Sequence, residues 1–275
     1  MGSLTAGTDS LLKTTGRHMD DIKRDAEAEF VWPQVNKVGM DAPMRWLKRG
    51  WADFCRAIEA SIFYGLAFTV MGWVLITYAT DAAWELALVT GFLILGPFLA
   101  LGLYDISRRL ELKEKVRLGP TLAAWRRNAP AVGFYALILS LIMSAWIRVA
   151  LVVIALFFPR GTPTLKEIVT SVVTSPEGFI FFVAYSAAGA GFALLVFATS
   201  VVSIPMLLDR EKMDALSAMI VSFNAVKKNF LPLLLWAGII VVLVTLGFVS
   251  WFAGLSVAVP VIGHATWHAY RDLVR

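Results

Sequence analysis

The sequence has little of the material from which metal and redox centres are built. Its single cysteine, Cys55, excludes an intramolecular disulfide and a thiolate metal cluster within one chain. Three histidines are too few for the ligand set of a haem-copper oxidase core. No glycine-rich phosphate loop follows a strand, and no nucleophile stands beside its base in a catalytic motif. These absences predict a protein that is not an enzyme and that carries no cofactor.

Charge is scarce in six long apolar runs, and these runs predict the architecture. About 20 apolar residues that rise ~1.5 Å each cross the ~30 Å hydrocarbon core of a bilayer. Hydrophobic residues make up 58% of the chain, a fraction far above that of a soluble domain. The predicted fold is therefore all-α, a polytopic membrane helix bundle with six transmembrane helices at residues 58–79, 83–104, 131–157, 179–208, 231–249 and 252–269.

Basic residues lie almost entirely on one side of these runs. Of the 25 Lys and Arg residues, nine precede the first run, seven follow the second, four follow the fourth and two follow the sixth. Only Arg160 and Lys166 lie in the alternate loops, and Arg148 lies inside a run. Because Lys and Arg concentrate in cytoplasmic loops, both termini of this multi-pass chain are predicted to be cytoplasmic.

The net charge of +5 comes from residues that flank the apolar runs rather than from a separate basic domain. Such clusters are attracted to anionic lipid headgroups. We therefore expect the lipid bilayer, its anionic headgroups and other membrane proteins as partners, and not nucleic acid. Residues 1–40 are too polar to build a core and are predicted to form a flexible cytoplasmic tail before a six-helix transmembrane domain at 41–275. No cleavable signal peptide is expected, since the first apolar run starts near Ile58.

One pattern occurs three times: an amphipathic stretch, a basic cluster and a helical hairpin. The first stretch runs from Met44 to Ile58, the second surrounds Trp125, and the third runs from Met213 to Phe223. The second and third end in the related strings WRRNAP and VKKNFLP. This recurrence predicts three hairpin repeats. The stretches are either cytoplasmic interfacial amphipathic helices or cytoplasmic extensions of the spanning helices.

Two histidines near the end of the last run form the candidate metal site. The spacing of four places His264 and His268 on one helix face, the arrangement that a helix offers a metal ion. Further ligands would come from similar depth, where Tyr104, Asp105 and Asp209 end other returning helices. The alternative is that both rings make structural hydrogen bonds to neighbouring helices.

Arg148 is the only basic residue inside a predicted span. An arginine near the bilayer centre costs about 2.5–3.5 kcal/mol on insertion scales, so it should turn inward, pair or reach toward the surface. Candidate counter-charges are Asp81, Glu85 and Glu177. The interpretation as a structural ion pair competes with that of a charge at the mouth of a substrate cavity.

Each returning helix carries a proline: Pro97, Pro205 and Pro260. Proline frees a backbone carbonyl one turn back, which either kinks the helix or exposes a carbonyl for binding. In the fourth run Ala187 and Gly191 are four residues apart. Small residues at this spacing let helices approach closely, so the fourth helix is predicted to be central.

Four segments resemble a bacterial family of predicted integral membrane proteins, domain of unknown function 2189. They are APMRWLKRGWADF before the first run, GFLILGPFLALGLYDISRRLE in the second, SVVSIPMLLDR in the fourth and PVIGHATWHAYRDLV in the sixth. The resemblance extends from about Asp41 to Val274. It implies a six-helix protein of the bacterial cytoplasmic (inner) membrane, and some members carry the label of cytochrome c oxidase subunit. The family offers no catalytic residues to carry over.

These observations lead to two expectations of function. The first is a non-enzymatic accessory or organising component that acts through lipid and protein contacts near respiratory complexes. The alternative is a carrier or channel for a small solute or metal ion, with the histidine pair and Arg148 at opposite mouths. A polar cavity that reaches the midplane favours transport, whereas a solidly packed interior favours the accessory role.

Overall fold

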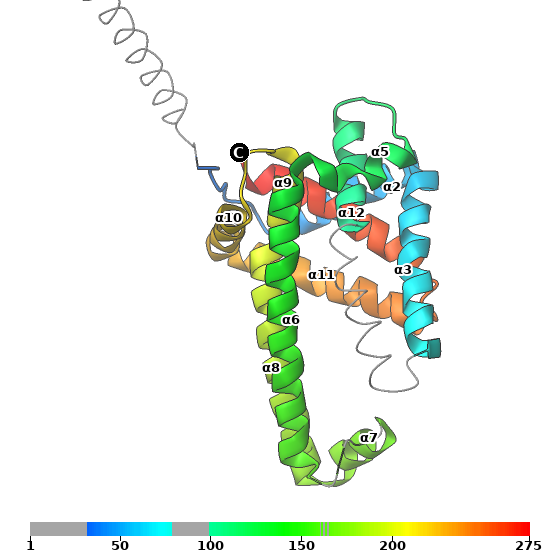
Figure 1. Ribbon diagram of the computed structural model, residues 1–275, viewed down its shortest axis with the longest axis vertical. Coiled ribbons are helices and arrows are strands. Elements are labelled where there is room, and N and C mark those ends of the chain that lie inside the picture. The colour runs from blue at the N-terminus through cyan, green and yellow to red at the C-terminus, as the bar shows by residue number, and fades with distance from the viewer. Residues whose placement is uncertain (1–31, 79–98, 160, 162, 164) are drawn as a thin grey trace, which may run out of the picture. The chain divides into compact units, whose positions relative to one another are not determined.

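The structure, a computed structural model, describes residues 32–78 and 99–275 apart from 160, 162 and 164 (Figure 1). Val35–Arg275 form one compact unit, and all helices given below belong to it. Outside an isolated bridge between Val35 and Val274, the described residues form helices and loops, which confirms the all-α prediction. Most of the predicted run 83–104, together with Pro97, lies outside the described residues.

The first amphipathic stretch is a helix that meets the next one at a wide angle. Helix α2, Ala42–Arg56, is followed after one residue by α3, Ile58–Tyr78, and α2 is bent by 106° from the segment Ile58–Val74. Pro43 stands in the first turn of α2, where its missing N–H costs no hydrogen bond. A straight extension of α3 would share its axis, so the bend supports the interfacial interpretation of α2.

Three surfaces of α2 have different surroundings. Trp46 and Gly50 are buried. A β-carbon added at Gly50 would lie 2.6 Å from the backbone nitrogen of Ala265, which shows how closely α2 crosses the last helix. Met44 and Trp51 are each 52% exposed on a second, apolar side. The third, exposed side carries Arg45, Arg49 and Arg56, whereas Lys48 lies on the apolar side with Met44 and Trp51.

The second amphipathic stretch does not form a continuous helix, which corrects the prediction for this copy. It consists of the short helix α5, Leu118–Leu122, and the 3-10 turn η1, Ala124–Asn128. The third stretch is helical over α10, Ala215–Lys228.

The middle of the chain forms a long hairpin. Helix α6, Ala129–Phe157, and helix α8, Pro176–Ser200, pack side by side, and α7, Leu165–Thr174, connects them (Figure 1). The Ser175 hydroxyl caps α8 by accepting a hydrogen bond of 3.0 Å from the Gly178 amide. Helix α8 ends at Ser200, and after Val201 and Val202 the chain continues as helix α9, Ser203–Asp209.

Three described segments are long and apolar enough to cross a bilayer, and the bent pair of α2 and α3 would make a fourth. The three are Ala124–Phe157, Pro176–Asp209 and α11, Phe230–Val249. The predicted run 252–269 corresponds to α12, Leu255–Leu273, which is not among them. Polar residues in the second half of α12 lower its hydropathy, beginning with His264.

The junctions before α3, α6 and α11 share one backbone conformation. The residue between the helices has φ −126° and ψ 43° at Ala57, −145° and 55° at Asn128, and −127° and 43° at Asn229. The two asparagines are the corresponding residues of WRRNAP and VKKNFLP, and both are buried. Asn128 Nδ2 donates to the carbonyl of Met213 at 2.8 Å, and Asn229 Nδ2 donates to that of Asn36 at 2.8 Å. This common geometry supports the repeat hypothesis.

The hydrophobic core lies at one end of the helices. It takes residues from the first turns of α6 and α11, the last turns of α12, most of α9 and one face of α10. Its largest fully buried side chains include Trp46, Trp236 and Trp267. The stretch Val35–Val38 also joins this end, since the amide of Asn36 donates to the carbonyl of Leu273 at 2.8 Å. The compact unit therefore begins before the predicted domain boundary at Asp41.

Candidate functional site

The second half of α12 contacts carboxylates from three other parts of the chain. Trp267 Nε1 donates to Glu111 Oε2 at 3.0 Å, and His268 Nε2 donates to Asp53 Oδ2 at 2.8 Å. The Tyr270 hydroxyl donates to Asp209 Oδ2 at 2.7 Å. Asp53 lies on α2, Asp209 ends α9, and Glu111 ends the helical segment 99–111. We call these contacts the closing-helix network: Trp267, His268, Tyr270, Asp53, Glu111 and Asp209.

Arg271 and Asp272 extend the network toward the surface. The Arg271 guanidinium lies 3.0 Å from Glu111 Oε1 and 3.4 Å from Asp209 Oδ2, and so bridges two of the carboxylates. Asp272 accepts hydrogen bonds from Trp46 at 2.9 Å and from Arg49 at 3.1 Å. Burial raises the pKa of the Tyr270 hydroxyl, and the Asp209 carboxylate raises it further. Tyr270 therefore stays a neutral donor, and the network fixes the end of α12.

His264 is fully buried between two serine hydroxyls. Its Nε2 lies 2.9 Å from Ser61 Oγ of α3, and its Nδ1 lies 2.8 Å from Ser107 Oγ of segment 99–111. The single proton of Ser61 is donated to the Ala57 carbonyl at 2.8 Å. Ser61 must then accept from Nε2–H, so Nδ1 is the acceptor of the Ser107 proton. The contacts assign a neutral imidazole with both nitrogens engaged.

His264 and His268 have different hydrogen-bond partners. His264 contacts serines, whereas His268 contacts Asp53. In the described residues no three His, Cys, Asp or Glu side chains lie together as metal ligands. The metal interpretation remains a prediction that awaits a metal measurement, and the observed contacts match the alternative of hydrogen bonds to neighbouring helices.

Asp105, a predicted further ligand, lies buried beside two arginines. Arg109 Nε donates to Asp105 Oδ2 at 2.6 Å, and Arg108 Nε lies 3.8 Å from Oδ1. Neither Asp105 Oδ1 nor Arg108 Nε has a hydrogen-bond partner within the described part of the chain. The two guanidinium groups place positive charge on both sides of this carboxylate. Asp105 therefore belongs to a local ion-pair group, distinct from the contacts of His264.

Arg148 is exposed on α6, and the described residues offer it no ion pair. Of the predicted counter-charges, Asp81 and Glu85 lie outside the described residues. Glu177, which lies in the first turn of α8, forms no salt bridge with Arg148. The structure therefore brings Arg148 to the surface of the α6–α8 hairpin, and the choice between its two interpretations stays a prediction.

Of the three prolines in the predicted returning helices, the structure describes Pro205 and Pro260, and these two affect their helices differently. Pro205 stands in the first turn of α9, just after the break at Val201 and Val202 that separates this helix from α8, as expected when proline clashes with the residue four positions back. The Ser203 hydroxyl donates to the Thr199 carbonyl at 2.6 Å across this break. Pro260 lies inside α12, which continues unbroken from Leu255 to Leu273.

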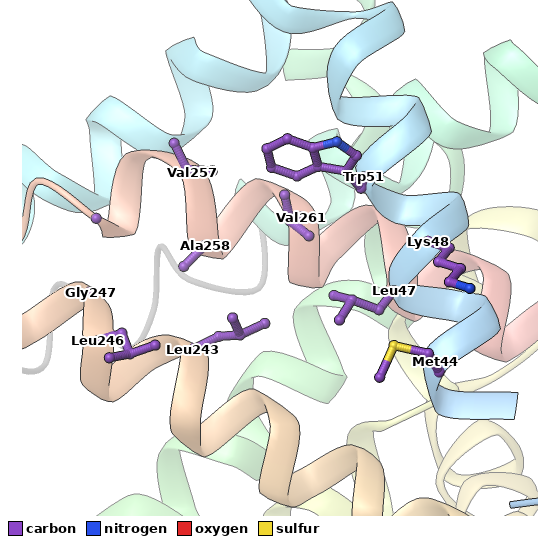
Figure 2. A pocket seen from close by; sticks show the side chains of 11 residues that line it. Met44, Leu47, Lys48, Trp51, Leu243, Leu246, Gly247, Val257, Ala258 and Val261 are labelled. Atoms are coloured by element: carbon purple, nitrogen blue, oxygen red, sulfur yellow. The ribbon is translucent and has the colours of Figure 1, made fainter. Parts of the chain in front are cut away.

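An apolar groove lies between α2, α11 and α12 (Figure 2). Its volume is about 500 Å³. Figure 2 shows Met44 and Lys48 on α2 at one end of the groove, and Leu246 and Gly247 on α11 at the other. Lys48 is the only charged residue among those that line it: Met44, Leu47, Lys48, Trp51, Leu243, Leu246, Gly247, Gly254, Val257, Ala258 and Val261.

Two further apolar hollows open near α8, and one polar cleft lies at the other side of α2. Trp146 on α6 lines one of the two hollows, and Phe230 on α11 lines the other. Half of the residues that line the polar cleft are basic, and some of these form ion pairs, such as Arg45 with Asp41 and Arg49 with Asp272. Among the described pockets, those along the candidate spans are therefore apolar.

The α6–α8 hairpin exposes much of its apolar surface. In the most apolar part of Ala124–Phe157, 6% of the residues are buried, against 44% in Pro176–Asp209. A β-carbon added at Gly189 would contact Trp146 of α6 at 3.2 Å, whereas one added at Gly191 would meet nothing within 4 Å. Gly189 thus faces α6, whereas the pair of Ala187 and Gly191 is exposed. The contacts agree with the prediction of a central helix only on the side of α8 that faces α6.

Sequence reasoning missed most partners of the closing-helix network and both serine partners of His264. Asp53, Glu111, Ser61 and Ser107 carried no motif, and they lie between 156 and 215 residues from their partners. The available signal was the density of polar aromatic residues in HATWHAYRD, which is high for the end of an apolar helix. Such residues need partners when buried, and that need predicts a contact surface on α12.

Comparison with known proteins gives one match. No curated protein and no solved structure matches the chain. Residues 85–209 match a family described as predicted integral membrane protein, DUF2189. The matched part includes the segment GFLILGPFLALGLYDISRRLE and all but the last residue of SVVSIPMLLDR, so the predicted resemblance is confirmed for them, while the first and last segments lie outside the match. Residues 85–209, less than half of the chain, are therefore similar to the DUF2189 family of predicted integral membrane proteins.

Proposed function

We propose that the chain is a non-enzymatic accessory or organising component of the bacterial cytoplasmic membrane, acting through lipid and protein contacts. In this proposal it crosses the membrane six times as three hairpins, with both termini in the cytoplasm. The one-sided distribution of Lys and Arg supports that orientation. The shared conformation of Ala57, Asn128 and Asn229 supports the three hairpins.

The observation that carries the proposal is the exposed apolar surface of the α6–α8 hairpin. Large apolar side chains of α6 and α8 are exposed over the length of both helices, for instance Leu141, Leu156 and Val183. In a membrane such a surface is covered by lipid or by another apolar helix. The exposed pair of Ala187 and Gly191 would allow a partner helix to approach the α8 backbone closely.

The polar interior supports the accessory role over the carrier alternative. The buried groups of the closing-helix network and the His264 site bond to one another rather than to a cavity. Along the candidate spans, the described hollows are lined by apolar side chains. A carrier needs a polar path with groups free to bind its solute, whereas the groups of the closing-helix network and of the His264 site already bond to one another.

Purification in mild detergent, followed by identification of the proteins that co-purify, tests the proposal. Gly191→Leu places a bulky side chain in open space on α8, so it should leave the fold intact and displace a partner helix. Gly238→Leu makes the same change in open space on α11 and is the matched control. We expect a membrane protein to co-purify with the wild type and with Gly238→Leu, and to be lost with Gly191→Leu.

Two results would contradict the proposal. One is a wild-type protein that purifies without any protein partner yet drives uptake of a small solute into vesicles, which would favour the carrier. The other is a partner that stays bound to Gly191→Leu as firmly as to the control, which would exclude this side of α8 as the contact surface.

A further inference from the structure

The apolar groove between α2, α11 and α12 has the polarity of a phospholipid. Its walls are formed by aliphatic side chains and one indole, and its volume of about 500 Å³ falls in the usual range of ligand pockets. Ala258 has a small side chain in the wall, which leaves room for an acyl chain between the helices. One end carries a cation, Lys48 (Figure 2).

Lys48 differs from the other basic residues of α2 because it lacks a carboxylate partner in the described part of the chain. Arg45 pairs with Asp41, Arg49 with Asp272 at 3.1 Å, and Arg56 with Asp53 at 3.8 Å. An ammonium group with three donors and no acidic neighbour is suited to a phosphate oxygen. Lys48 therefore places a positive charge beside the apolar groove.

Trp51 adds a second feature of a membrane interface. Its side chain is 52% exposed and lines the groove on the same helix as Lys48. Tryptophan concentrates at the level of lipid headgroups, where its ring is partly apolar and partly hydrated. The bend of 106° after α2 fits a helix that lies along this level.

We propose that this groove binds one acyl chain of an anionic phospholipid whose phosphate contacts Lys48. The occupant is a lipid rather than a partner helix, because an apolar helix provides no anion for the unpaired lysine at the end of the groove. The inference rests on the lipid contacts of the proposed function and assigns them to one site and one lipid class.

Photolabelling of the full chain in nanodiscs tests the site. The probes are phosphatidylglycerol and phosphatidylcholine, each with a photoreactive diazirine in one acyl chain, and mass spectrometry locates the labelled peptides. We expect phosphatidylglycerol to label the groove segments 44–51 and 243–261 more strongly than phosphatidylcholine. Lys48→Gln should reduce the phosphatidylglycerol label about fivefold, the factor that one basic residue contributes near an anionic surface.

Matched variants separate charge, shape and folding. Lys48→Arg should keep the phosphatidylglycerol label, since it keeps the charge. Lys212→Gln removes an exposed lysine outside the groove and should also keep it. Ala258→Phe fills the groove and should abolish the groove label from both lipids. Gel filtration of each variant shows whether it is folded, and Lys48→Gln changes only an exposed side chain.

Equal labelling of the groove by the two lipids, or an unchanged label in Lys48→Gln, would overturn the inference. A cross-link from groove residues to a co-purifying protein would overturn it too and would make the groove a protein interface. If anionic lipid labels the α6–α8 hairpin but not the groove, this inference fails while the proposed function stands. If the groove is labelled but no protein co-purifies, the inference stands and the protein-contact part of the proposed function fails.

Discussion

Substitution of Gly50 by alanine should detach α2 from α12. A β-carbon at this position would lie 2.6 Å from the backbone nitrogen of Ala265 and 2.8 Å from the carbonyl oxygen of Val261, where ordinary contact begins at 3.4 Å. Both atoms belong to the backbone of a helix, so they cannot rotate away as a flexible side chain would. One helix has to shift as a whole to admit the methyl group.

The expected change in the free energy of unfolding combines three effects: overpacking, helix propensity and strain in two hydrogen bonds. Overpacking of this kind costs ~1–3 kcal/mol. Alanine recovers up to ~1 kcal/mol through its higher helix propensity than glycine. The shift also strains the bonds on either side of Gly50, from His268 to Asp53 at 2.8 Å and from Trp46 to Asp272 at 2.9 Å. Hydrogen bonds to charged groups contribute ~1.5–3 kcal/mol each, so the net loss should be about 2 kcal/mol.

Reversible unfolding in mild detergent, followed as a denaturant titration, measures this loss. The control is Gly238→Ala on α11, where no atom lies within 4 Å of the added carbon. Its free energy of unfolding should equal that of the wild type or exceed it by up to ~1 kcal/mol. If Gly50→Ala proves as stable as Gly238→Ala, the close crossing of α2 and α12 does not exist and the reasoning fails.

Three further predictions concern capping, the histidines and topology. The Asp214 carboxylate caps α10 by accepting from the Ser217 amide at 2.9 Å, and hydrogen bonds from the Ser217 hydroxyl and then from this amide lower its pKa below the ordinary 3.8. Its stabilisation is therefore present above that value and is lost as the pH falls through the lower, folded-state pKa. Asp214→Ala should cost ~1 kcal/mol at neutral pH in thermal unfolding, while Asp214→Asn keeps the cap but removes the pH dependence below pH ~4. Double replacement of His264 and His268 by alanine should lower stability and leave the metal content unchanged, and stoichiometric metal in the wild type that the double variant lacks would reverse this. Reporter fusions should signal the cytoplasm after Val38, Lys115, Arg210 and Arg275 and the outer side after Thr164; a cytoplasmic signal at Thr164 would refute the six-span topology.

Hydropathy was a good guide to the helices that face outward. The runs 131–157 and 231–249 correspond closely to α6 and α11, because a long apolar run has no competing structure in a membrane. It was a poor guide to α12, where a helix that is apolar at its start carries buried polar groups at its end. A hydropathy value averaged over the run hides these polar side chains, whereas in the structure each of them has its own hydrogen-bond partner.

The site was predicted only in part, for a similar reason. The spacing of His264 and His268 was visible in the sequence, and it correctly placed them on one helix. The partners were not visible, because Ser61, Ser107 and Asp53 reach the histidines through folding of distant segments. A motif on one helix indicates which side chains point together, while the chemistry depends on what the neighbouring helices bring.

The position of the closing-helix network along the chain has a consequence for synthesis. Three carboxylates, Asp53, Glu111 and Asp209, are made well before the side chains that bond them on α12. While the earlier helices enter the membrane, these carboxylates have to remain hydrated or pair elsewhere. Assembly of this end is then completed by the arrival of one helix, which joins three earlier segments together. A chain stopped before Leu255 would expose all three at once, a feature by which quality-control proteases could distinguish unfinished molecules from finished ones.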